Sequence, residues 1–178
     1  MTGLANRYRL NAYSEKVLDY CYEHRLPLAM EILDIDFFKQ YNDNYGHQQG
    51  DECIIAIADE LKKMEDRQTF CARYGGDEFI IIYAGASAEE VYAKAAALRQ
   101  NIMDLKLEHL YSKALPIVTI SQGISYGVPE EGNRSWDFLH TADMLLYQVK
   151  KKSRNDICIA DIRGQELDLS SKQEKVEP

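Results

Sequence analysis

The alternation of apolar and polar residues along the chain predicts short strands and amphipathic helices. Apolar residues at helical spacing indicate helices, whereas short runs rich in β-branched and aromatic residues indicate strands. The predicted helices cover residues 11–24, 37–45, 50–64, 87–107 and 135–152. The predicted strands cover residues 28–35, 69–74, 79–83, 117–126 and 156–160. We expect one folded domain over residues 1–162, followed by a flexible polar tail over residues 163–178.

Three local signals refine these elements. Ser87 and Glu90 have the spacing of a capping box, so the helix there should begin just after Ser87. Ser135 is expected to cap the last helix. Gly123 lies inside a strand pattern, which indicates either a bulge or a close approach of another backbone.

The order of the elements predicts an α+β fold of the ferredoxin-like, palm type, in which a central antiparallel sheet is flanked by helices. In this topology the third strand lies between the first and the second, antiparallel to both. The end of the first strand, with Asp34 and Asp36, should therefore meet the start of the third strand, with Asp77 and Glu78. Because four acids packed closely would repel one another, we expect a divalent cation there.

Gly75 and Gly76 precede the second acidic pair and join two apolar strands. Glycine tolerates the positive φ angles of a tight two-residue hairpin, so we predict such a turn here. Bare glycine backbone also lets the phosphates of a ligand approach closely. The alternative is an ordinary hairpin with solvated acids, and only the convergence with the first strand favours a metal site.

Composition narrows the class of protein. The chain has 178 residues, 46% of them hydrophobic, and a formal net charge of -8. That charge disfavours electrostatic binding to nucleic acid or to an anionic membrane. Four widely spaced cysteines and the absence of a long uncharged apolar run favour reduced thiols and a cytoplasmic location, although a longer parent protein could be anchored in a membrane.

A series of motifs occurs in a fixed order along the chain. They are Thr2-Gly3-Leu4-Ala5-Asn6-Arg7, Asp34-Ile35-Asp36-Phe37-Phe38-Lys39, Asn42-Asp43-Asn44-Tyr45-Gly46-His47, Gly50-Asp51, Arg73-Tyr74-Gly75-Gly76-Asp77-Glu78-Phe79, Val118-Thr119-Ile120-Ser121-Gln122-Gly123-Ile124, Ala142-Asp143, Tyr147, Lys150 and Arg154-Asn155. Together they resemble the GGDEF domain of diguanylate cyclases over about residues 2–160. Members of this family join two GTP molecules into cyclic di-GMP and release two pyrophosphates.

The resemblance implies a metal-dependent active site. Asp34, the Ile35 carbonyl and Asp77 would bind Mg²⁺, with Mn²⁺ as an alternative. The metal would clamp the α-phosphate of GTP while the 3′-hydroxyl of the second GTP attacks it. Glu78 is the second acid of the motif, and either metal support or proton handling is open to it.

The resemblance also implies a GTP site. Asn42 and Asp51 would read the guanine edge, although Asn42 could simply be a helix-end residue and Asp51 a helix N-cap. His47 would lie near the nucleotide or make a structural hydrogen bond. The groups that would meet the phosphates are the backbone of Gly75 and Gly76, the helix-opening amides of Phe38 and Lys39, and the cationic side chains of Lys39, Lys150 and Arg154.

One motif of many family members is missing. Where they carry an Arg-x-x-Asp product-binding site, this chain has Asp66-Arg67-Gln68-Thr69, so we expect weak or absent inhibition by the product. The two-fold symmetry of the product implies a homodimer. The family also implies an upstream sensory or dimerising domain in the parent protein. Two competing readings are a catalytically silent GTP-binding or interaction domain, and a cyclase for adenine-containing dinucleotides, which Asp51 disfavours.

Overall fold

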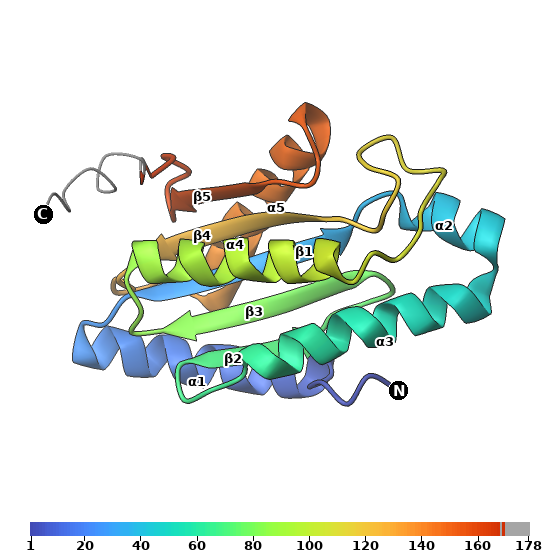
Figure 1. Ribbon diagram of the computed structural model, residues 1–178. Helices are drawn as coiled ribbons and strands as arrows, with labels where there is room; N and C mark the ends of the chain where they lie inside the picture. Colours follow the sequence, from blue (N-terminus) through green and yellow to red (C-terminus); the bar gives the residue numbers. More distant parts are fainter. Residues whose placement is uncertain (168, 170–178) are drawn as a thin grey trace, which may run out of the picture.

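The computed structural model describes residues 1–167 and 169, which fold around one mixed sheet. Within this part of the chain the strands are β1 (Leu28–Ile35), β2 (Thr69–Arg73), β3 (Glu78–Ala84), β4 (Ile120–Gly127) and β5 (Ile157–Asp161). Their spatial order is β2-β3-β1-β4-β5 (Figure 1). β3 lies between β1 and β2 and is antiparallel to both, and β1 is antiparallel to β4. β5 adds a parallel edge strand, so the predicted palm-type α+β fold is confirmed.

Helices cover both faces of the sheet. They are α1 (Arg7–His24), α2 (Phe38–Tyr45), α3 (His47–Met64), α4 (Ala88–Asp104) and α5 (Ser135–Lys152). α1 and α5 share one apolar cluster with one face of the sheet, and α3 and α4 share a second cluster with the other face (Figure 1). β1 is buried along its whole length, which explains why its sequence is an apolar run without alternation.

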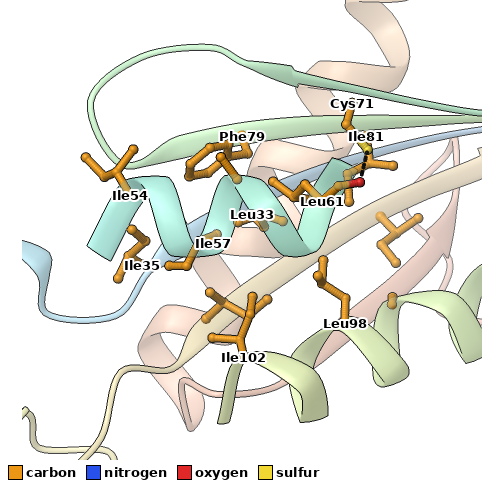
Figure 2. Packing of buried hydrophobic residues seen from close by; sticks show 14 of the residues in the cluster. Leu33, Ile35, Ile54, Ile57, Leu61, Cys71, Phe79, Ile81, Leu98 and Ile102 are labelled. Atoms are coloured by element: carbon orange, nitrogen blue, oxygen red, sulfur yellow. Dashed lines mark hydrogen bonds between the residues drawn. The ribbon is translucent and has the colours of Figure 1, made fainter. Parts of the chain in front are cut away.

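The cluster under α3 and α4 is built from interlocking aliphatic side chains. Ile57 of α3 and Leu98 and Ile102 of α4 pack over Leu33 of β1 and Phe79 of β3 (Figure 2). Each of these side chains is at least 99% buried. Burying a side chain of this size contributes about 1.5–3 kcal/mol, so the cluster fixes both helices against the sheet.

Helix boundaries differ from the prediction at several places. α3 begins at His47, three residues early, because Gly46 with φ 86° turns the chain directly from α2 into α3. Asp51 is therefore inside α3, and the alternative interpretation of Asp51 as a helix N-cap is wrong. Ser87 does cap α4: its hydroxyl oxygen accepts from the Glu90 amide, and the Ser87 amide donates to the Glu90 carboxylate. Ser135 does not cap α5, because its hydroxyl donates to the carboxylate of Glu15 on α1.

Gly123 is a point of close approach and not a bulge. It pairs in continuous register with Ile32 of β1 and Cys158 of β5. A Cβ at this position would lie 2.3 Å from the carbonyl oxygen of Ala142 on α5. Because any side chain would push α5 off the sheet, the glycine sets the distance between α5 and β4.

The chain after β5 folds back along that strand. Leu167 N donates to the Ile159 carbonyl oxygen at 3.1 Å, and Ala160 and Glu166 form an antiparallel bridge. Leu167 and Leu169 pack against the core cluster under α3 and α4. The tail predicted from residue 163 thus starts with a return segment on the sheet edge, while residues 168 and 170–178 lie outside the described residues. None of the described helices is long and apolar enough to cross a membrane.

A carboxylate is buried in the middle of the sheet. Glu31 of β1 is fully buried and accepts hydrogen bonds of 2.7 Å from the Tyr83 hydroxyl and from Gln122 Nε2. Gln122 Nε2 also donates to the Ala95 carbonyl oxygen of α4 at 3.2 Å. Burial raises the pKa of Glu31 to about 7, although both hydrogen bonds oppose the rise.

This raised pKa makes stability depend on pH. Between the ordinary carboxyl pKa of 4.5 and about 7, the folded state keeps a proton on Glu31 that the unfolded state has lost. Stability should therefore fall as pH rises through this window. Relative to Glu31→Gln, the wild-type free energy of unfolding should drop by about 2 kcal/mol from pH 5 to pH 7.5. Urea unfolding at both pH values measures this, with exposed Glu23→Gln as control, and parallel wild-type and Glu31→Gln values would contradict it.

Candidate active site

The predicted acids do meet at one edge of the sheet. Asp34, near the end of β1, pairs directly with Glu78 at the start of β3 and with Ser121 on β4. Asp77 immediately precedes Glu78, and its charge acts on Asp34. Residues more than forty positions apart are thus brought together by the antiparallel register, as the topology predicted.

The glycine turn differs from the predicted tight hairpin. Tyr74 N and Gly75 N both point to the Glu78 carbonyl oxygen, at 2.9 Å and 3.4 Å, so the loop is longer than two residues. Neither Gly75 nor Gly76 has a positive φ, and that prediction was wrong because the longer loop does not need one. Arg73 Nη2 donates to the Gly76 carbonyl oxygen at 2.8 Å. Both glycines are exposed, and a Cβ on Gly76 would meet nothing within 4 Å.

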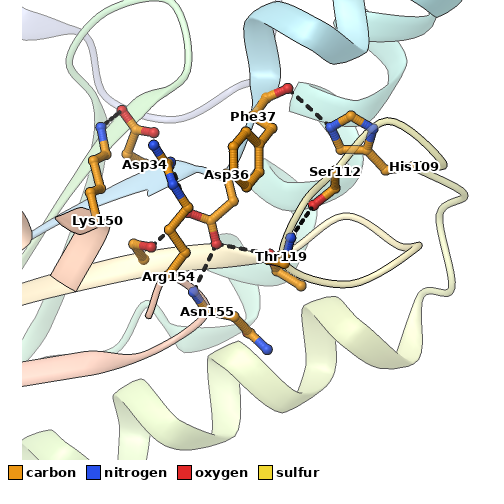
Figure 3. A network of polar contacts seen from close by, with 11 residues as sticks. Asp34, Asp36, Phe37, His109, Ser112, Thr119, Lys150, Arg154 and Asn155 are labelled. Atoms are coloured by element: carbon orange, nitrogen blue, oxygen red, sulfur yellow. Dashed lines mark hydrogen bonds and ion pairs between the residues drawn. The ribbon is translucent and has the colours of Figure 1, made fainter. Parts of the chain in front are cut away.

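Asp34 is a buried acid faced by one cation. Its residue is 7% exposed, and Lys150 Nζ lies 2.6 Å from its Oδ2 (Figure 3). Burial raises the pKa of Asp34 to about 6; Lys150 opposes the rise, and the charges of Asp77 and Glu78 add to it. The edge therefore carries an excess of negative charge that favours binding of a cation.

The donor chemistry fits a hard divalent cation. Asp34, Asp77 and Glu78 offer only carboxylate oxygens, the ligands that Mg²⁺ and Mn²⁺ prefer. Among the described residues, no three His, Cys, Asp or Glu side chains are gathered as a preformed metal centre. The Asp34 oxygen instead faces the Lys150 ammonium, so a bound cation would compete with Lys150 for this carboxylate.

Asp36 has a structural environment, unlike Asp34. Its carboxylate is fully buried and accepts hydrogen bonds from Thr119 Oγ1 at 2.8 Å, Ser121 Oγ at 2.6 Å and Asn155 N at 2.9 Å (Figure 3). Arg154 Nη1 lies 3.5 Å from Asp36 Oδ1. This acid is neutralised by the protein itself, so the expectation that a cation neutralises the whole acidic group does not hold for Asp36.

The cations predicted for phosphate binding lie on the same edge. Lys150 is in the last turn of α5, and Arg154 is in the turn that follows it. The Arg154 guanidinium lies over the Phe37 ring, 4.2 Å from its centroid (Figure 3). Both side chains are partly exposed, at 27% for Lys150 and 29% for Arg154, so each has surface that a ligand can contact.

The start of α2 is held in an unusual conformation. Phe37 is its N-cap, with φ 55°, and its side chain makes no capping hydrogen bond to the first amides of α2, which include those of Phe38 and Lys39. His109 is fully buried, and its Nε2 lies 3.0 Å from the Phe37 carbonyl oxygen (Figure 3). Lys39 is exposed. No sequence pattern indicates the His109 contact, because it joins residues 72 positions apart.

The predicted guanine-reading residues come from two neighbouring helices. Asn42 of α2 is packed against Gly50 of α3, where a Cβ would lie only 1.8 Å from Asn42 Oδ1. Asn42 Oδ1 is buried and has no hydrogen-bond partner among the described residues. Asp51 follows Gly50 and is exposed, as is His47 at the start of α3. An unpaired buried acceptor beside an exposed carboxylate suits a ligand that brings several donors.

Two hollows lie near these elements. One of about 240 Å³ adjoins the acidic edge and is lined by Glu78, Asp143, Met144, Leu146, Tyr147 and Lys150. A larger hollow of about 720 Å³ lies between α4, the end of α5 and β5, and none of the predicted site residues lines it. Size alone therefore does not locate the candidate site; the converging charges do.

Comparisons with known proteins agree with this geometry. Residues 1–156 match the family profile described as "Diguanylate cyclase, GGDEF domain". The probable diguanylate cyclase DgcC of Escherichia coli (strain K12) is 34% identical over 158 residues, which are 87% of this chain and 41% of DgcC. The chain thus spans well under half of that relative.

Solved structures show the same fold. The coiled coil and GGDEF domain of DgcB from Caulobacter crescentus, in complex with c-di-GMP, is 29% identical with a TM-score of 0.80, covering 89% of this chain and 83% of that one. The active GGEEF domain of a diguanylate cyclase from Vibrio cholerae is 30% identical with a TM-score of 0.75, covering 88% and 97%. The motifs, the sheet topology and these matches together place the chain in the GGDEF-domain family of diguanylate cyclases.

Proposed function

We propose that this chain is a diguanylate cyclase domain that condenses two GTP molecules into cyclic di-GMP and releases two pyrophosphates. The observation that carries the proposal is the edge where Asp34, Asp77 and Glu78 interact and where Lys150 and Arg154 project. Acids that can hold a cation, beside partly exposed basic side chains that can hold phosphates, are the combination that nucleotidyl transfer requires.

Recognition of guanine is assigned to Asn42 and Asp51. The Asp51 carboxylate accepts from N1–H and N2–H of guanine, and the unpaired Asn42 Oδ1 offers a further acceptor nearby. Gly50 keeps the space between them open, because a larger residue would displace the Asn42 amide. His47, at the start of α3, stays assigned to the nucleotide side of the site.

The phosphates are assigned to the opposite end of the site. The amides of Phe38 and Lys39, at the positive end of α2, bind phosphate oxygens, helped by the exposed Lys39 ammonium. Arg154 offers two donors in a fixed plane, and Lys150 a single mobile charge. The exposed backbone of the glycine turn completes the cradle.

Asp34, Asp77 and the Ile35 carbonyl would hold Mg²⁺ or Mn²⁺, which when bound supplies a Lewis acid for the α-phosphate. Lys150 would lie beside the phosphates, because its ammonium is 2.6 Å from Asp34, one of the acids that would hold the cation. Glu78, paired with Asp34 across the strands, would add negative charge that favours the bound cation. The site holds one GTP, so the symmetric product needs two copies of the chain facing each other.

Replacing one metal-binding acid tests the reaction. Asp77→Asn should lower release of pyrophosphate from GTP and Mg²⁺ by about a hundred-fold or more, because a neutral amide holds the cation poorly. Asp19→Asn, on the exposed face of α1, is the matched control and should keep wild-type turnover. Wild-type protein that binds GTP but releases no pyrophosphate would contradict the cyclase proposal and favour a silent GTP-binding domain.

Base selectivity tests the guanine assignment. Asp51→Ala should reduce the preference for GTP over ATP by about ten-fold, since unpaired donors on a bound base cost about 1–3 kcal/mol. Competition binding with both nucleotides measures this. Glu52→Ala removes the next exposed acid, which bonds Gln49 instead, and should leave the preference intact. An unchanged preference in Asp51→Ala would show that the base is read elsewhere.

Control by the product should be weak. Where the family pattern has Arg and Asp, Asp66 and Thr69 are both bonded to Lys94 of α4, at 3.0 Å and 2.8 Å, and Asp66 would repel a phosphate. Calorimetric titration of cyclic di-GMP into the GTP-free domain should show no tight binding. Sub-micromolar binding that is lost in Arg67→Ala but survives Asp77→Asn would overturn this expectation.

A further inference from the structure

The turn between α5 and β5 has a strained backbone. Arg154 and Asn155 are consecutive non-glycine residues with φ values of 52° and 46°. In this left-handed region the Cβ of an L-residue crowds the following carbonyl oxygen, so single residues are uncommon there and pairs need support from outside the turn. The support in this protein comes from two elements that are distant in sequence.

Groups of opposite charge hold the two sides of Asn155. Its N–H donates to Asp36 Oδ2 at 2.9 Å (Figure 3), and its carbonyl oxygen accepts from Arg99 Nη1 of α4 at 2.8 Å. Both are charge-assisted hydrogen bonds, the stronger class in proteins. Asn155 Nδ2 also lies 3.4 Å from Met103 Sδ, one helical turn beyond Arg99, so α4 contacts this residue twice.

Arg99 reaches the turn from outside the candidate active site. α4 packs on the face of the sheet opposite to α5, and no residue of α4 lines the hollow beside Glu78. Arg99 Nε is buried and has no hydrogen-bond partner among the described residues. The Arg99 side chain therefore gives up part of its hydration when its Nη1 bonds the Asn155 carbonyl oxygen.

The two hydrogen bonds to the Asn155 backbone also restrict the conformation of Arg154, the residue before it. Because Asn155 N belongs to the peptide group that follows Arg154, holding it sets the direction in which the Arg154 side chain leaves the turn. That direction places the Arg154 guanidinium over the Phe37 ring, 4.2 Å from its centroid, and 3.5 Å from Asp36 (Figure 3). A turn that relaxed to ordinary φ values would move the guanidinium away from both.

We propose that Arg99 is a positioning residue for Arg154, acting through the Asn155 carbonyl and never touching the nucleotide. The proposal rests on the proposed function, because only there is Arg154 assigned to the phosphates of GTP. It makes α4, which carries none of the predicted site residues, part of the machinery that binds substrate.

A double-mutant cycle on Arg99 and Arg154 tests this, with methionine replacing each arginine. The probe is 3′-deoxy-GTP with Mg²⁺, which lacks the attacking hydroxyl and binds without turnover. When Arg154 is present, Arg99→Met should raise the Kd of 3′-deoxy-GTP about ten-fold, since small misplacements of a binding group are costly. In the Arg154→Met background, Arg99→Met should raise the Kd by less than about two-fold. Equal losses in both backgrounds, or no loss in either, would overturn the proposal.

Two further variants separate positioning from general stability. Arg99→Lys keeps the charge and one donor, so it should restore part of the affinity. Lys94→Met removes another cation of α4 whose partners are Asp66 and Thr69, and it should leave the Kd unchanged. Thermal unfolding of Arg99→Met establishes that the variant is folded.

A nucleotide-free measurement keeps the two proposals distinguishable. The NMR resonance of the Arg154 Nε–H group, assigned through Arg154→Met, should shift in Arg99→Met and stay in place in Lys94→Met. An unshifted resonance would contradict the positioning role even if the protein bound no nucleotide. Wild-type protein that binds no 3′-deoxy-GTP, with the expected shift present, would contradict the proposed function alone.

Discussion

A carboxylate that leaves water must be satisfied by hydrogen bonds inside the protein, and Asp36 is fully buried at the end of β1. Its carboxylate accepts hydrogen bonds from the hydroxyl groups of Thr119 and Ser121 and from the amide of Asn155. One side chain thus links the end of β1 to β4 and to the turn before β5. The start of α2, which follows Asp36 directly, is placed by the same bonds. The end of the site proposed to bind phosphates therefore depends on this buried acid.

Asp34, two residues earlier, lacks such a network of hydrogen bonds around its carboxylate. Its carboxylate is opposed by the Lys150 ammonium, and burial together with neighbouring acids raises its pKa to about 6. Because the ion pair is partly exposed and the charge is not cancelled by a network, this acid keeps its capacity to bind a ligand. The two aspartates of one motif thus differ in their surroundings: Asp36 is satisfied by the protein, and Asp34 faces one ammonium group.

α4 connects the core with the site. On one side its Ala95 carbonyl accepts from Gln122, which also bonds the buried Glu31. One turn later Arg99 bonds the carbonyl of Asn155. Because the same rigid helix contacts both Gln122 in the core and Asn155 in the strained turn, it holds the turn at a fixed position relative to the core. A mobile loop could not do so.

The order of the elements, the Ser87 cap, the convergence of Asp34 with Glu78 and the family all follow from the sequence, because periodicity and caps are carried by residues close in the chain and the crossover rules then fix the strand order. The internal hydrogen bonds of Asp36, and the return of the chain beyond residue 162 along β5 to Leu167, are visible in the folded protein alone. The prediction of positive φ angles at Gly75 and Gly76 is wrong, because these angles depend on the length of the loop. The hydrogen bond that the Asn155 amide donates to Asp36 spans 119 positions, and such pairings follow from how packed elements meet, which no local pattern records.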